Sequence, residues 1–110
     1  MNQLVKFRDA LALYRKHKWR LVKSLMRAET LELLHGEGGD GSEFEGAPVE
    51  ESELDAMWFT REAAGGREAW ELRLVADPPY ALFELFEPDE DEEDRADVRR
   101  EMEARLREKG

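Results

Sequence analysis

The side chains in this sequence best suited to binding a ligand are basic residues at helical spacing. Residues 2–28 are predicted to be helical, either as one continuous helix or with a break in the polar run at residues 15–18. On a continuous helix, 4-3-4 steps place four cations on one face. These residues are Lys16, Arg20, Lys23 and Arg27. A stripe of this kind can neutralise the phosphates of a nucleic acid. The alternative is that the stripe pairs with the acids of its own chain or is simply solvated.

Catalytic and metal-binding patterns are missing from the sequence. The two histidines, His17 and His35, lie outside H-E-x-x-H and other metal-ligand spacings, and the chain has no cysteine. None of the serines lies in a G-x-S-x-G motif. We therefore expect a protein that is not an enzyme and that has no cofactor and no metal site.

Composition limits the class of protein. The chain has 110 residues, 41% of them hydrophobic and 40% charged, with a net charge of −10. This length suits a single domain over residues 1–110. No apolar run is long enough to span a bilayer and no signal-peptide pattern is visible, so we expect a cytoplasmic protein that does not enter membranes. The first 30 residues hold eight of the basic side chains and only two acids, so a basic arm precedes an acidic remainder.

A three-stranded antiparallel meander is predicted over residues 57–87. Gly65-Gly66 suits a two-residue hairpin turn, and Pro78-Pro79 marks a second turn because proline cannot donate to a strand ladder. This register pairs Phe59 with Leu72, and it places seven apolar residues on one buried face. That predicted core consists of Met57, Phe59, Trp70, Leu72, Leu74, Phe83 and Leu85.

The flanking segments complete an α+β fold. The predicted order is an N-terminal helix, an antiparallel meander of three or four strands, and a C-terminal helix. Residues 30–35 are assigned to the fourth strand, although they also suit the end of a helix before Gly36. Residues 36–53 are expected to form a flexible, acidic, glycine-rich loop. The C-terminal helix, from about residue 89 to 109, carries a narrow apolar stripe of Val98, Met102 and Leu106.

The second face of the predicted meander carries the functional hypothesis. Five of its apolar side chains are expected to bind a partner: Trp58, Val75, Tyr80, Leu82 and Phe86. The C-terminal stripe is narrower than this patch, so we expect a non-enzymatic protein–protein interaction or regulatory module, with self-association as a homodimer. The alternatives are a face covered by the chain's own helix, a nucleic-acid-associated protein using the basic stripe, and a small ligand-binding domain with a pocket near Trp58 or Trp70.

Overall fold

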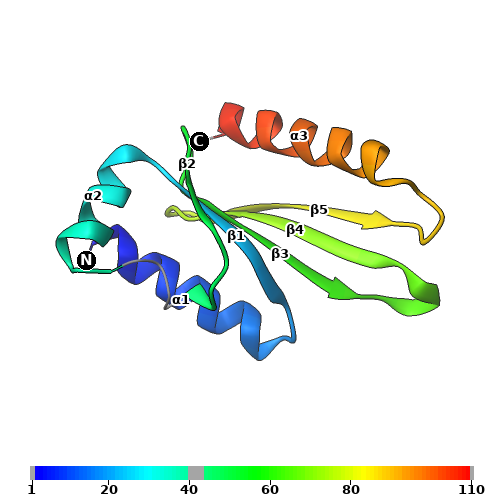
Figure 1. The fold of residues 1–110 in the computed structure, drawn as a ribbon, viewed down its shortest axis with the longest axis horizontal. Coiled ribbons are helices and arrows are strands. Elements are labelled where there is room, and N and C mark those ends of the chain that lie inside the picture. The colour runs from blue at the N-terminus through cyan, green and yellow to red at the C-terminus, as the bar shows by residue number, and fades with distance from the viewer. Residues whose placement is uncertain (1, 40–43, 110) are drawn as a thin grey trace.

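The computed structural model describes residues 2–39 and 44–109, which form an α+β fold built on one five-stranded sheet (Figure 1). The helices are α1 (Gln3–Lys16), α2 (Ala28–Gly36) and α3 (Glu92–Lys109). The strands are β1 (Arg20–Met26), β2 (Val49–Glu51), β3 (Ala56–Glu62), β4 (Glu68–Leu74) and β5 (Tyr80–Phe86). Their order in the sheet is β2-β1-β3-β4-β5, with every pair antiparallel except β1 with β2. The predicted fold class, the consecutive three-stranded meander and the C-terminal helix are confirmed.

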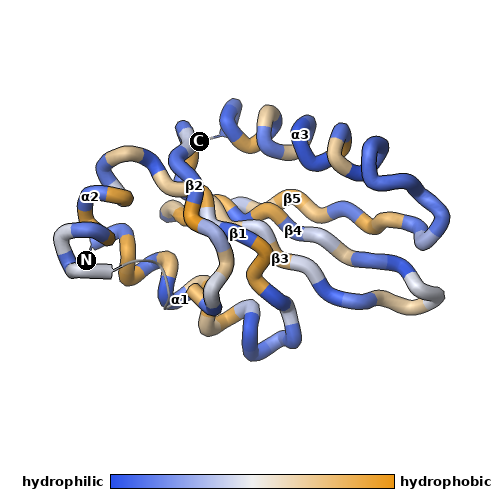
Figure 2. The backbone as a smooth tube through the Cα atoms, viewed as in Figure 1, coloured by the Kyte–Doolittle hydropathy of each residue, from blue (hydrophilic) through white to orange (hydrophobic). Residues whose placement is uncertain are grey.

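The helices cover different strands on the two faces of the sheet. On one face, α1 and α2 make their main sheet contacts with β1, and on the other face α3 packs on β4 and β5 (Figure 1). Each face has its own core cluster. The first, under α1, is centred on Phe7, Met57 and Phe59, and the second, under α3, is centred on Trp58 and Leu72. Although α3 is largely hydrophilic (Figure 2), its Met102 and Leu106 are buried in the second cluster.

The N-terminal helix is shorter than the sequence predicts. The side chain of Asn2 caps α1 by accepting a hydrogen bond of 3.1 Å from the backbone N–H of Val5. The helix ends at Lys16, and Lys18 then turns the chain with a φ of 73°. The prediction of helix over 20–28 is wrong for residues 20–26, because β1 lies inside the sheet and buries side chains on both faces. A strand buried on both faces lacks the alternation that marks a half-buried strand, so its leucines also fit a helical period.

Two further assignments before the meander need correction. Residues 30–35 belong to α2 and not to a strand, so the helix-end alternative before Gly36 is the one observed. The loop predicted over 36–53 is wrong in its second half, where Phe44 is fully buried against Phe7 and Val49–Glu51 forms β2. Residues 40–43 lie outside the described part of the chain.

The predicted register of both hairpins is wrong. Ala64–Gly66 form a three-residue turn, with Gly65 and Gly66 both at positive φ, so Phe59 pairs with Glu71 and not with Leu72. The second connection has five residues, so Leu74 pairs with Tyr80. Hydrophobic pattern could not fix the register because helices cover both faces of the sheet and both faces carry apolar residues.

Correcting the register divides the predicted core. Trp70, Leu72 and Leu74 face α3, whereas Met57 and Phe59 face α1. The remaining two members, Phe83 and Leu85, share the α1 side with Ala81, but they lie on β5, where α1 does not cover them. They are therefore exposed.

Candidate functional site

An uncovered half of the α1-side sheet face is the best candidate for a functional surface. We call this surface the open face and define it by four side chains: Leu13, Trp19, Phe83 and Leu85. Phe83 is 56% exposed, Leu85 37% and Leu13 48%, which makes them three of the five exposed large hydrophobic residues in the described chain. A concentration of apolar side chains at the surface is typical of an interaction site.

Trp19 lies between Leu13 of α1 and Phe83 of β5 on the open face. Its indole meets the ring of Phe83 edge to face, with 6.5 Å between ring centroids. The guanidinium of Arg61 lies 4.6 Å from the centre of the indole, a cation–π contact that fixes the ring. Trp19 sits in the short connection between α1 and β1, so the early end of α1 is what exposes this aromatic pair.

A polar cluster lies between Leu13 and β4, at the base of a cavity of about 240 Å³. The phenol of Tyr14 donates a hydrogen bond to the carboxylate of Glu71, and its ring stacks on Phe59 with 4.1 Å between centroids. The guanidinium of Arg73 lies 5.5 Å from the centre of the Tyr14 ring. Burial and the bond to Glu71 raise the pKa of Tyr14 above its usual value, so the phenol stays protonated as a donor. The contacts of this cluster hold Tyr14 and Glu71 in place beneath the open face.

Strand β5 forms one edge of the sheet. Within the described chain it pairs with β4 on one side and with no strand on the other. Edge strands in stable monomers usually carry charges or prolines that block further pairing. On its open face β5 presents only Ala81, Phe83 and Leu85, so no charged side chain of this strand lies on that face; its one charged residue, Glu84, lies on the other face.

Four of the five residues predicted to bind a partner are buried within the chain itself. Trp58, Leu82 and Phe86 lie beneath α3, and Val75 belongs to the first core cluster. Tyr80 is 38% exposed, with the ammonium of Lys109 lying 4.8 Å from the centre of its ring. The assumption that this set forms one uncovered face is therefore wrong. The residues that remain exposed, Phe83 and Leu85, are ones that the predicted register assigned to the core.

The basic stripe predicted on a continuous helix does not form. Lys16 ends α1, Arg20 and Lys23 lie on β1, and Arg27 precedes α2. Lys23 pairs with Glu50 at 2.8 Å, and Arg27 pairs with Glu29 at 3.6 Å. The four cations do not share a helical face, so the premise of the nucleic-acid hypothesis is wrong.

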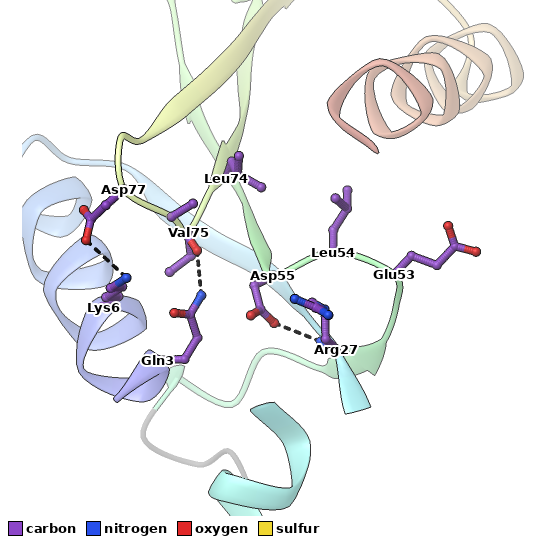
Figure 3. A pocket seen from close by; sticks show the side chains of 10 residues that line it. Gln3, Lys6, Arg27, Glu53, Leu54, Asp55, Leu74, Val75 and Asp77 are labelled. Atoms are coloured by element: carbon purple, nitrogen blue, oxygen red, sulfur yellow. Dashed lines mark hydrogen bonds and ion pairs between the residues drawn. The ribbon is translucent and has the colours of Figure 1, made fainter. Parts of the chain in front are cut away.

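A second cavity, of about 380 Å³, lies where α1, β4 and the start of β3 meet (Figure 3). Its polar groups bind one another: Lys6 pairs with Asp77 at 3.1 Å, and the amide of Gln3 donates to the carbonyl of Val75 at 2.6 Å. Asp55 accepts a hydrogen bond from the backbone N–H of Arg27 at 2.9 Å. These bonds connect elements distant in the sequence, which favours a structural role over ligand binding.

Among residues 2–39 and 44–109, no group of three or more His, Asp or Glu side chains could hold a metal ion. No described helix is long and apolar enough to cross a membrane. Comparison with protein-family models, with curated proteins and with solved structures gives no match for the chain. The open face and the cavities are therefore the features of the described chain that can suggest a function.

Proposed function

We propose that this protein is a non-enzymatic interaction module that self-associates through the free edge of β5. The observation that carries the proposal is that every β5 side chain on the open face is apolar and exposed, on a strand with one unpaired edge. A second strand added there would satisfy the backbone groups of the edge and place apolar side chains beside Phe83 and Leu85.

The symmetry of β5 favours a second copy of this chain as the occupant. The open-face residues Ala81, Phe83 and Leu85 are placed evenly about Phe83, the middle residue of the seven-residue strand. Antiparallel pairing of two copies about a two-fold axis at Phe83 would place Ala81 beside Leu85 of the second copy. The one charged residue within the strand, Glu84, would then lie opposite Leu82, so no acid faces another acid across the new strand pair.

Net charge opposes this association at long range. Each copy carries −10, so two copies repel each other at low ionic strength. Salt screens that repulsion over about 8–10 Å at physiological ionic strength. The proposed pair is therefore expected to strengthen as salt increases, in contrast to a contact held by ion pairs.

Light scattering across protein and salt concentration tests the proposal. The wild-type protein is expected to approach twice its monomer mass of 12.8 kDa at high protein concentration and moderate salt. Phe83→Glu should remain a monomer, because it places two carboxylates at the two-fold axis. Leu33→Glu is the matched control, since Leu33 is an exposed leucine of α2 outside the open face.

Circular dichroism melts check that both variants stay folded, and both are expected to do so. A wild-type protein that remains monomeric at every concentration and salt level contradicts the proposal. Dimerisation of Phe83→Glu equal to that of the wild type contradicts it as well.

A further inference from the structure

A separate pocket lies on the other face of the sheet, between α3 and strands β1, β3 and β4. Its volume is about 350 Å³, at the lower end of the range for small-molecule sites. Val22, Trp58 and Trp70 provide its apolar wall. The open face lies on the opposite side of the sheet, so this pocket is independent of the proposed self-association.

Two indole rings shape the apolar wall. Trp58 and Trp70 meet edge to face, with 5.9 Å between ring centroids. The N–H of Trp58 donates to the carboxylate of Glu103 at 2.8 Å, which fixes the ring and engages the one acid that lines the pocket. Trp58 is only 1% exposed, so the half-buried Trp70 supplies the aromatic surface that a flat apolar group can reach.

Three cations line the same pocket: Lys23, Arg99 and Arg100. On a chain of net charge −10, the lining thus carries three positive side chains and one negative side chain. The acids that pair with these cations are Glu50, Glu92 and Asp97, which are not part of the lining. The lining taken by itself is therefore positive, while each of its cations is paired with an acid that lies outside it.

The three cations differ in how firmly they are held. Arg99 lies 4.7 Å from the centre of the Trp70 ring while it pairs with Glu92, so two contacts fix its guanidinium. The pair of Arg100 with Asp97 is largely exposed, at 71% and 61%. Exposed ion pairs contribute little, so a ligand can replace Asp97 at low cost. Arg100 is the cation best able to turn to a bound anion.

We infer that this pocket binds a small planar aromatic anion. The aromatic ring would lie against the accessible part of the Trp70 indole. Arg100, with Lys23 across the pocket, would bind the anionic group, because a guanidinium forms two parallel hydrogen bonds with a carboxylate or phosphate. A neutral ligand of the same shape would gain the aromatic contacts alone.

Titration with naphthalene-2-carboxylate and naphthalene-2-carboxamide tests this inference. The two probes have the same ring and differ in charge. NMR signals of the indole N–H groups report binding, with Trp58 and Trp70 in the pocket and Trp19 on the opposite face as an internal reference. The carboxylate is expected to bind about tenfold more tightly than the amide, the difference that one charge-assisted hydrogen bond supplies.

Arg100→Gln should remove most of that difference while leaving the fold intact, because the side chain is exposed. Arg107→Gln is the matched control: it makes the same change of charge on an exposed part of α3 outside the pocket. A parallel titration with adenosine and adenosine monophosphate decides whether the anion is a phosphate; a preference for the phosphate that Arg100→Gln removes also supports the inference.

Three outcomes would overturn the inference. The first is equal binding of the charged and neutral members of both probe pairs. The second is an equal loss of affinity in Arg100→Gln and Arg107→Gln. The third is a set of shifts confined to Trp19.

Discussion

The carboxylate of Asp55 accepts a hydrogen bond of 2.9 Å from the hydroxyl of Thr30, across 25 residues of sequence. Its other oxygen accepts from the backbone N–H of Arg27, also at 2.9 Å. Arg27 is the N-cap residue of α2 and makes no side-chain cap of its own. Asp55 therefore caps α2 from the start of β3, and its negative charge lies at the positive end of the helix.

Removing this cap is expected to weaken the fold. In Asp55→Ala the N–H of Arg27 and the hydroxyl of Thr30 lose their shared acceptor in a buried setting. The free energy of unfolding should fall by about 1–3 kcal/mol in urea titration. Glu53→Ala, an exposed acid two residues earlier, should change it by less than about 0.5 kcal/mol. Equal effects of the two substitutions would contradict the capping role.

The raised pKa of Tyr14 predicts how the stability of the fold changes at alkaline pH. Burial and the hydrogen bond to Glu71 raise its folded pKa above the unfolded value of 10.0. A raised pKa favours the protonated form in the folded state. The stabilising contribution of this group is thus complete below pH 10 and is lost as pH rises towards the folded pKa.

The variant Tyr14→Phe isolates this contribution. It should keep the stacking on Phe59 but lose the hydrogen bond, at a cost of about 1–2 kcal/mol near neutral pH. Above pH 10 the wild-type stability should fall more steeply than that of the variant, by up to about 1.4 kcal/mol per pH unit. Denaturant melts at several pH values measure both slopes. Parallel slopes would show that Tyr14 does not titrate between the two states.

The strand register predicts opposite results for two residues of the meander. Leu72 is fully buried under α3, so Leu72→Ala should cost about 2–5 kcal/mol. Phe83 is exposed on the open face, so Phe83→Ala measured on the monomer should cost less than about 1 kcal/mol. Thermal or chemical denaturation at low protein concentration separates the two. Comparable losses would support the register in which both residues share one core.

The burial of Phe44 predicts that the acidic segment around it is needed for folding. The ring is fully buried and meets Phe7 edge to face, with 6.2 Å between centroids. Phe44→Ala should therefore cost about 3–5 kcal/mol, measured by urea denaturation. Glu51→Ala, at the exposed end of β2, is the control and should be close to neutral. If Phe44→Ala left the free energy of unfolding unchanged, this segment would behave as the flexible loop predicted over residues 36–53.

The sequence predicts which helices and strands the fold contains better than it predicts how the strands pair. Proline, glycine and long periodic runs mark the meander and α3, and these elements are observed. Register depends on turn length, and the Gly-Gly pair suits either a two-residue or a three-residue turn. A difference of one residue moved Phe59 from opposite Leu72 to opposite Glu71.

The candidate site depends on features that local sequence does not contain. Phe83 and Leu85 have the residue types of a core, and only the place where α1 ends leaves them exposed. A ligand pocket near Trp58 or Trp70 is one of the alternatives that the sequence leaves open. Its cations come from β1 and α3, which are distant in the sequence, so their convergence could not be predicted.

The position of β1 inside the sheet has a consequence for synthesis. Both strands that pair with β1 lie later in the chain, at Val49–Glu51 and Ala56–Glu62. Because the chain leaves the ribosome N-terminus first, the segment Arg20–Met26 emerges before either partner strand and has both of its edges unpaired. α1 and α2 are short-range structures that can form at once and cover one side of it. Until β2 and β3 pair with it, β1 is therefore protected by these helices alone.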